Sequence, residues 1–168
     1  LLDSPHTAQV VVTNLRDGGY HLQARAVDAE GGVSFWVPLG SANINEADFI
    51  VTNVAPVLTS LQQLQSGSTT PIADEGVALD GALEFSGAIN DEEGQDVRLE
   101  VEVKPIGETF TNVLTLQSAL LPNGTTVQIP YAALPEGNYH WQARAVDALG
   151  GASEWLSFGT ADISAVDF

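Results

Sequence analysis

The sequence contains no cysteine, and only five of its 168 residues are lysine or arginine. The lack of cysteine excludes a disulfide bond, a thiolate metal site and a cysteine nucleophile within this chain. No apolar run approaches the roughly 18 residues of a membrane-spanning helix, so no membrane-spanning segment is predicted. The chain also opens with Leu1-Leu2 instead of methionine, and we expect it to be a fragment of a larger protein.

Acidic residues, by contrast, are abundant. Twenty-two aspartates and glutamates accompany the five basic residues, which gives a net charge of -17 at pH 7. Such a surface repels phosphate backbones, so we expect no nucleic-acid partner. A strongly negative surface keeps a protein soluble and also attracts divalent cations, and composition leaves both interpretations open.

The sequence repeats itself at a spacing of 119 residues. Residues 1–49 align with residues 120–168 without a gap, and 24 of the 49 aligned pairs are identical. The densest match sets residues 18–28 against residues 137–147, where Tyr-His and Gln-Ala-Arg-Ala-Val-Asp occur in both copies. Agreement of this density at a fixed spacing indicates tandem copies of one structural unit.

The repeat sets the expected domain boundaries. Because one unit is 119 residues long, residues 1–49 correspond only to its C-terminal portion. We therefore predict that residues 1–52 are the C-terminal half of a preceding module, with strands E, F and G plus a linker, and that residues 53–168 are a complete module. The sequence Asn53-Val54-Ala55-Pro56 marks the boundary, since the residue before a proline favours an extended backbone.

The half module has too few residues to bury an apolar face by itself. Three strands in about 50 residues would leave the core side of Tyr20, Leu22, Val37 and Leu39 in water. We expect its missing strands to come from an upstream stretch of the same protein or from another copy of the chain.

Alternating apolar and polar residues predict strands throughout the complete module. Residues 97–104 read Val-Arg-Leu-Glu-Val-Glu-Val-Lys, and residues 139–146 alternate around Trp141. Further apolar positions fall at residues 83–85 and 127–131, and turns rich in glycine, proline and asparagine separate these runs. No segment has a helical period. About seven short strands in ~110 residues predict an all-β, antiparallel, immunoglobulin-like β-sandwich.

The segment from Leu134 to Tyr139, Leu-Pro-Glu-Gly-Asn-Tyr, resembles the tyrosine corner and F strand of fibronectin type III modules. The half module carries a related motif from Leu15 to Tyr20. The resemblance implies the strand order A-B-C-C′-E-F-G, with the B–C and F–G loops at one pole. It gives both tyrosines and both leucines a structural role, in which each tyrosine hydroxyl bonds the backbone across the corner.

The chain as a whole resembles repeats of large bacterial surface and secreted proteins. It departs from fibronectin modules in one respect, because Leu83 and Phe85 occupy the run in which the B-strand tryptophan is expected. A more general immunoglobulin-like topology therefore stays open.

The main candidate for chemistry is the acidic run from Asn90 to Asp96. Calcium prefers about six to eight oxygen ligands, and a carboxylate-rich turn with a glycine can wrap one, although the spacing here is not that of an EF-hand. A solvated acidic turn explains the same residues, and both interpretations stay open. The resemblance brings the F–G loop and the end of the preceding module to the same pole. The candidate calcium ligands are Asp91, Glu93, Asp96, Asp147 and Asp48, and no other cofactor is expected.

Two further sets of polar residues have structural explanations. His21 and His140 recur at equivalent positions and are predicted to face solvent from the F strand. Glu100 and Glu102 are predicted to form ion pairs on an open sheet, because catalytic carboxylates need a cleft and differently tuned surroundings. We therefore predict that the chain is not an enzyme.

Antiparallel pairing around Leu149-Gly150 places Arg144 opposite Trp155. The same register places Arg25 opposite Trp36 in the half module. Leu156 and Phe158 are the expected core residues, so each tryptophan ring should lie on the outer face with the guanidinium within ~6 Å of its centroid. Glu100 or Glu102 on the neighbouring strand is positioned to pair with the same arginine.

These features predict a non-catalytic structural or adhesive repeat module, a spacer, stalk or fibre of an extracellular or cell-surface protein. Its expected partners are neighbouring modules of the same protein or other copies of it. Two alternatives stay open: an adhesin module that binds a carbohydrate or a protein, and an accessory region of a large secreted enzyme.

Overall fold

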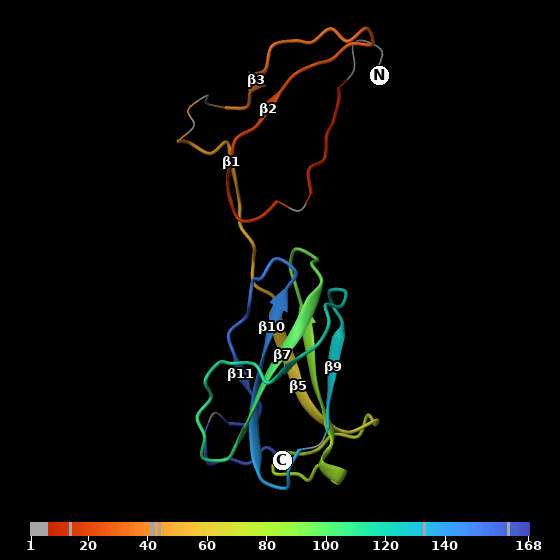
Figure 1. Ribbon diagram of the computed structural model, residues 1–168, viewed down its shortest axis with the longest axis vertical. Coiled ribbons are helices and arrows are strands. Elements are labelled where there is room, and N and C mark those ends of the chain that lie inside the picture. The colour runs from red at the N-terminus through yellow and green to blue at the C-terminus, as the bar shows by residue number, and fades with distance from the viewer. Residues whose placement is uncertain (1–6, 14, 41–42, 44, 133, 161) are drawn as a thin grey trace. The chain divides into compact units, whose positions relative to one another are not determined.

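The computed structural model describes residues 7–13, 15–40, 43, 45–132, 134–160 and 162–168. The chain divides between Asn53 and Val54 into two compact units (Figure 1). Unit 1 is the part up to Asn53, and unit 2 runs from Val54 to Phe168. Within the described residues, no helix is long and apolar enough to cross a membrane.

Unit 2 is an all-β, immunoglobulin-like sandwich of two antiparallel sheets, in the order β5-β6-β9 and β11-β10-β7-β8 (Figure 1). The strands are β5 (Val57–Gln65), β6 (Leu83–Asn90), β7 (Val97–Pro105), β8 (Leu116–Gln117), β9 (Thr126–Tyr131), β10 (Tyr139–Asp147) and β11 (Leu156–Ser157). A single 3₁₀ turn, η1 (Leu79–Gly81), precedes β6 in the described part of the unit. In chain order the strands take positions A, B, C, C′, E, F and G of the sandwich. This arrangement confirms the predicted fold class.

The core lies between the two sheets and results from the alternation in the sequence. β7 and β10 pair over their whole lengths, from Tyr139 opposite Pro105 to Asp147 opposite Val97. Alternate residues of β7 therefore point into the sandwich, and the first three of these, Val97, Leu99 and Val101, are completely buried. Each such side chain stabilises the fold by roughly 1.5–3 kcal/mol relative to exposure.

Trp141, on β10, is the largest fully buried side chain of the core. Its ring lies 4.6 Å from that of Phe85 and 5.1 Å from that of Phe158, measured between centroids. Both of its N–H groups are paired: Nε1 donates to Gln63 Oε1 at 3.0 Å, and the backbone N–H donates to Asp167 Oδ2 at 2.8 Å. The buried tryptophan of this core therefore lies on β10, and Phe85 on β6 packs against it.

One of the predicted core residues is not in the core. Leu156 is 44% exposed, whereas Phe158 packs against the core as expected. The physical reason is that β11 is a two-residue edge strand, and Leu156 lines an open groove of about 350 Å³ that Val57 also lines.

The described part of unit 1 contains two two-stranded ladders and an isolated bridge between Val27 and Val33. Its strands are β1 (Gly18–Tyr20), β2 (Gln23–Ala24), β3 (Val37–Pro38) and β4 (Phe49–Val51), with β1 paired to β4 and β2 paired to β3. Leu22, Val37 and Leu39 are 45%, 65% and 53% exposed. Trp141, the counterpart of Leu22 in unit 2, is completely buried. These three side chains of unit 1 are therefore exposed, whereas Tyr20 is half-buried and stacks on Phe49. That residues 1–52 are half of a module stays a prediction.

Leu22 and Trp141 allow a matched test of this difference. The N–H of Leu22 donates to Asp48 Oδ2 at 2.9 Å, and the equivalent bond of Trp141 is 2.8 Å long. Because only the second amide lies in a closed core, we expect the Trp141 N–H to exchange with deuterium at least ~10³-fold more slowly than the Leu22 N–H. Equal protection of the two amides, measured by NMR, would show that unit 1 is stable by itself.

Candidate functional site

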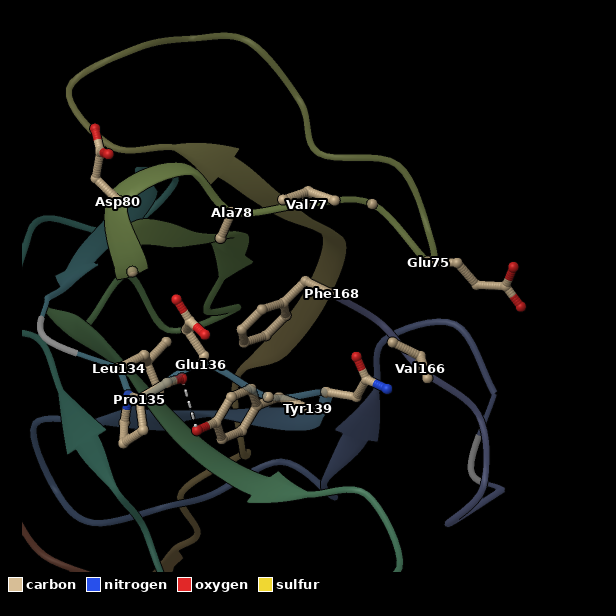
Figure 2. Close-up of a pocket in the computed structure, with 14 residues that line it drawn as sticks. Glu75, Val77, Ala78, Asp80, Leu134, Pro135, Glu136, Tyr139, Val166 and Phe168 are labelled. Atoms are coloured by element: carbon tan, nitrogen blue, oxygen red, sulfur yellow. Dashed lines mark hydrogen bonds between the residues drawn. The ribbon is translucent and has the colours of Figure 1, made fainter.

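A pocket of about 670 Å³ lies at the end of unit 2 where β10 begins (Figure 2). Its walls come from three segments: η1 and the residues before it, the loop that leads into β10, and the last residues of the chain. The apolar part of the lining consists of Val77, Ala78, Leu134, Pro135, Tyr139, Val166 and Phe168. The carboxylate side chains of the lining are Glu75, Asp80 and Glu136.

Tyr139 lines this pocket and is fixed by three neighbouring residues. Its hydroxyl donates to the carbonyl oxygen of Pro135 at 3.1 Å, which is the dashed line in Figure 2. Its ring stacks on Phe168 with centroids 5.5 Å apart and planes 17° apart. Leu134 packs against the core, and its N–H donates to the Gly81 carbonyl at 3.0 Å. The contacts of the predicted tyrosine corner are therefore present in unit 2.

The pocket offers apolar surface, carboxylates and exposed backbone. Among the described lining residues there is no histidine, lysine, serine or threonine. Gly137 and Asn138, both exposed, also form part of its wall.

Asp167 lies between two lining residues of the pocket but is itself fully buried. Its Oδ2 accepts the hydrogen bond from Trp141, and its Oδ1 has no hydrogen-bond partner among the described residues. Burial raises the pKa of Asp167 to about 7, against the lowering effect of the Trp141 N–H and with a further contribution from the charge of Asp74. Asp167 and Asp147 are the acidic residues of 120–168 that are identical in both copies of the repeat, and this recurrence is the signal that could have identified Asp167.

The predicted calcium ligands of unit 2 lie at the opposite end of β10, in the B–C and F–G loops. Asp91 is buried, and its Oδ1 accepts hydrogen bonds from the N–H groups of Glu93 at 3.0 Å and Gln95 at 2.9 Å. Asn123 Oδ1 accepts from the Asp91 N–H, and Asn123 Nδ2 donates to the Asp91 carbonyl, both at 2.7 Å. The Glu93 carboxylate accepts from the N–H of Val54 at 3.0 Å. These carboxylates therefore hold loop backbone in place.

Asp147 organises the F–G loop in the same way. Its Oδ1 accepts from the N–H groups of Leu149 at 2.8 Å and Gly151 at 2.9 Å. Asp96 is exposed, and Asp48 belongs to unit 1. Within the part of the chain that the structure describes, no group of three or more histidine, cysteine, aspartate or glutamate side chains is arranged to hold a metal ion. Calcium binding by the five carboxylates stays a prediction.

Part of the outer face of β7 and β10 is covered, around Glu102 and His140, which corrects the expectation of an open sheet. Glu102 is completely buried beneath the segment 106–115. Its carboxylate accepts from the Thr111 N–H at 2.8 Å, the Thr111 hydroxyl at 2.7 Å, the Asn112 N–H at 2.9 Å and Gln142 Nε2 at 2.8 Å. Burial alone would raise the pKa of Glu102, but these hydrogen bonds outweigh burial and place the pKa below its ordinary value.

His140 is also buried, so its predicted exposure to solvent is wrong. Only 1% of the residue is exposed, and its ring stacks on Phe110 with centroids 4.3 Å apart. Its Nε2 lies 2.8 Å from the Glu108 carbonyl oxygen, which can only accept, so Nε2 is the donor. Both partners come from the segment 106–115. The alternation of apolar and polar residues in β10 does not predict that this segment crosses the sheet.

The predicted stacking of arginine on tryptophan is confirmed in both units. Arg144 Cζ lies 4.8 Å from the centroid of the Trp155 ring, and Arg25 Cζ lies 4.8 Å from that of Trp36. The second predicted partner is also present, since Arg144 Nε and Nη2 each lie 2.8 Å from Glu100 Oε2. Stacking of this kind contributes about 0.5–1 kcal/mol at an exposed site.

Comparison with known proteins finds a similar structure but no family. No family model matches the chain. No curated protein matches it either. The PKD domain of an M14-like peptidase from Thermoplasmatales archaeon SCGC AB-540-F20 is similar at 18% sequence identity, over 64% of this chain and 94% of that chain, with a TM-score of 0.37. The sandwich fold of unit 2 rests on its own strand pairing.

The raised pKa of Asp167 predicts an unusual dependence of stability on pH. The pKa is about 7 in the folded chain and 3.8 for an ordinary aspartate, so between these values the folded state binds more protons than the unfolded state. The stability that this group contributes is complete below about pH 4 and is lost as the pH rises to about 7. The variant Asp167→Asn cannot titrate there. Its free energy of unfolding, relative to that of the wild type, should therefore increase over this range in urea titrations.

Asp162→Asn provides the control for this experiment. The Ser164 N–H and hydroxyl both bond to the exposed Asp162 carboxylate and lower its pKa. Asp162 is then ionised in both states above about pH 5, so the control should differ from the wild type by a constant amount. A constant difference for Asp167→Asn as well would contradict the assignment.

Proposed function

We propose that this chain is part of a tandem array of fibronectin type III-like modules, which serves as a non-catalytic spacer, stalk or fibre of an extracellular or cell-surface protein. The observation that supports the proposal most is the nature of the contacts that recur between the two copies. They hold the scaffold of each module together.

The recurring contacts have nearly the same geometry in both units. The tyrosine hydroxyl donates to the carbonyl of Arg16 in unit 1, at 2.7 Å, and to that of Pro135 in unit 2, at 3.1 Å. The N–H of Ala26 or Ala145 donates to the next serine hydroxyl along the chain at 2.9 Å, and the N–H of Gly32 or Gly151 donates to the loop aspartate at 2.6 or 2.9 Å. In both units the arginine Cζ lies 4.8 Å from the centroid of the tryptophan ring. Each contact fixes a corner, a hairpin or a loop. The residues that recur at a spacing of 119 are therefore those that stabilise the corner, the hairpin and the loop of each module.

The charge of the chain supports an array of separate modules. A net charge of -17 gives neighbouring modules surfaces of the same sign, which repel one another sideways. Modules that avoid lateral association and are joined end to end suit a spacer. The adhesin and enzyme-accessory alternatives have no comparable observation in their favour.

Small-angle scattering of concatemers tests the spacer proposal. Chains with two, three and four copies of residues 50–168 restore the natural junction, since Ile50 follows Phe49 in unit 1 as it would follow Phe168 in the concatemer. We expect the maximum dimension to grow by a constant increment with each copy. A dimension that stops growing would mean that modules collapse onto one another, and the spacer proposal would be abandoned.

We also propose that calcium binds at the loop end of unit 2. Asp96 is exposed, and its neighbour Val97 lies opposite Asp147 in the sheet, so the acidic residues of the B–C and F–G loops share this end. With a Kd of roughly 0.1–1 mM, which is typical of extracellular modules, calcium at about 10 mM would stabilise the fold by about 1.4–2.7 kcal/mol.

Thermal unfolding in calcium, in magnesium and in chelator tests this second proposal. Magnesium at equal concentration controls for screening of the negative surface. We expect the midpoint to rise with calcium beyond its value in magnesium, and Asp96→Asn to reduce the difference. An identical midpoint in calcium and in magnesium would sink the idea.

A further inference from the structure

The strand β4 of unit 1 contains the residues that come directly after the last phenylalanine of the repeat. β4 pairs antiparallel with β1, with Phe49 opposite Tyr20 and Val51 opposite Gly18. The segment after Phe49 therefore continues as a strand along the residues that precede the tyrosine.

A hydrogen bond to a carboxylate follows the last paired residues of β1 and β4. The N–H of Asn53 donates to Asp17 Oδ1 at 2.7 Å, directly beyond the paired residues. The repeat makes Glu136 the counterpart of Asp17. Glu136 lines the pocket of unit 2 (Figure 2).

Unit 2 reproduces the first step of the same pairing. The Tyr139 N–H donates to the Phe168 carbonyl at 2.9 Å, and the Phe168 N–H donates back to the Tyr139 carbonyl at 3.4 Å. Gly137, the counterpart of Gly18, is exposed, and its N–H has no hydrogen-bond partner among the described residues. Its position two residues before Tyr139 makes it the next residue able to exchange both hydrogen bonds with an antiparallel strand.

We propose that the pocket of unit 2 is a binding site, or seat, for a β-strand. The segment that follows Phe168 in the array pairs with Gly137, and its last N–H bonds to Glu136. Ile50 to Asn53 make the equivalent contacts with Gly18 and Asp17 in unit 1. This inference rests on the proposed tandem array and adds a specific junction to it. The occupant is an extended, β-branched stretch like Ile50-Val51, which binds by adding a strand to an exposed edge.

The geometry around Gly137 agrees with such a seat. The Asn138 carbonyl already accepts from the Ile106 N–H at 3.0 Å, on the side of β7. Backbone groups alternate in direction along a strand, so those of Gly137 point toward the edge on which Phe168 lies. The apolar pocket wall, with Val77 and Leu134, is available to the branched side chains of the incoming strand. A linker held in this way would be anchored to the module it leaves.

Three forms of the full chain test the proposal. The first ends at Phe168, the second is extended by Ile-Val-Thr-Asn, and the third is extended by Ile-Pro-Thr-Asn. Proline lacks the N–H that would donate to the Gly137 carbonyl, so the third chain, which differs from the second at this one residue, is a control matched in length. The measurements are deuterium exchange at the Gly137 N–H by NMR and the midpoint of thermal unfolding of unit 2.

We expect the Ile-Val-Thr-Asn chain alone to slow exchange at Gly137, by about tenfold or more, and to raise the midpoint by ~2–8 °C. Glu136→Ala in that chain should remove part of the rise. Equal exchange at Gly137 in all three chains would overturn the proposal. Slow exchange in the unextended chain that grows with protein concentration would mean that a second copy fills the seat, which also overturns it. Because scattering of the concatemers does not depend on this contact, the spacer proposal stands or falls separately.

Discussion

The fold of unit 2 depends on burying a tryptophan whose two N–H groups must both find acceptors. A buried N–H left without a partner costs roughly 1–3 kcal/mol, and Trp141 carries one on its ring and one on its backbone. Gln63 accepts the first and Asp167 the second. Gln63 Nε2 in turn donates to the carbonyl oxygens of Ala73 and Asp167. A single hydrogen-bonded group thus joins β5, β10 and the end of the chain across the core, and the raised pKa of Asp167 is a consequence of that burial.

The sequence predicts those features whose signal is local. Alternation identifies the buried faces of β7 and β10, because every second side chain of a strand points the same way. The tyrosine corner and the stacking of Arg144 on Trp155 follow from a short motif and from the register of one hairpin. Gln63 could not be found in this way. A β-bulge between Thr59 and Gln62 shifts the register of β5, and the residue types of this segment do not predict the bulge.

The errors have a common physical cause, which is coverage by a segment remote along the chain. Polar residues on β7 and β10 alternate with apolar ones and therefore predict a solvent-facing side. The segment 106–115 covers that side, with Phe110 stacked on His140 and Thr111 bonded to Glu102. The path of such a segment depends on contacts distant in sequence, so the alternation assigns Glu102 and His140 to the surface. The pocket at Tyr139 has no signal in the sequence for a similar reason, since its walls come from three separated segments.

The few basic residues of the chain are placed where negative charge is most costly. Three of them form ion pairs with the buried glutamates of β7. Arg98 Nη2 and Arg144 Nη2 each lie 2.8 Å from a carboxylate oxygen of Glu100, and Lys104 Nζ lies 3.7 Å from one of Glu102. A buried carboxylate without such partners would destabilise the fold, whereas an exposed one is solvated by water. Positive charge gathered over β7 leaves the rest of the surface with an excess of carboxylates. At physiological salt their repulsion reaches only about 8 Å, so it acts between surfaces that nearly touch and not along an extended chain. In the proposed array such a surface would oppose side-by-side contact of modules, whereas their end-to-end connection is covalent and is maintained by the chain itself.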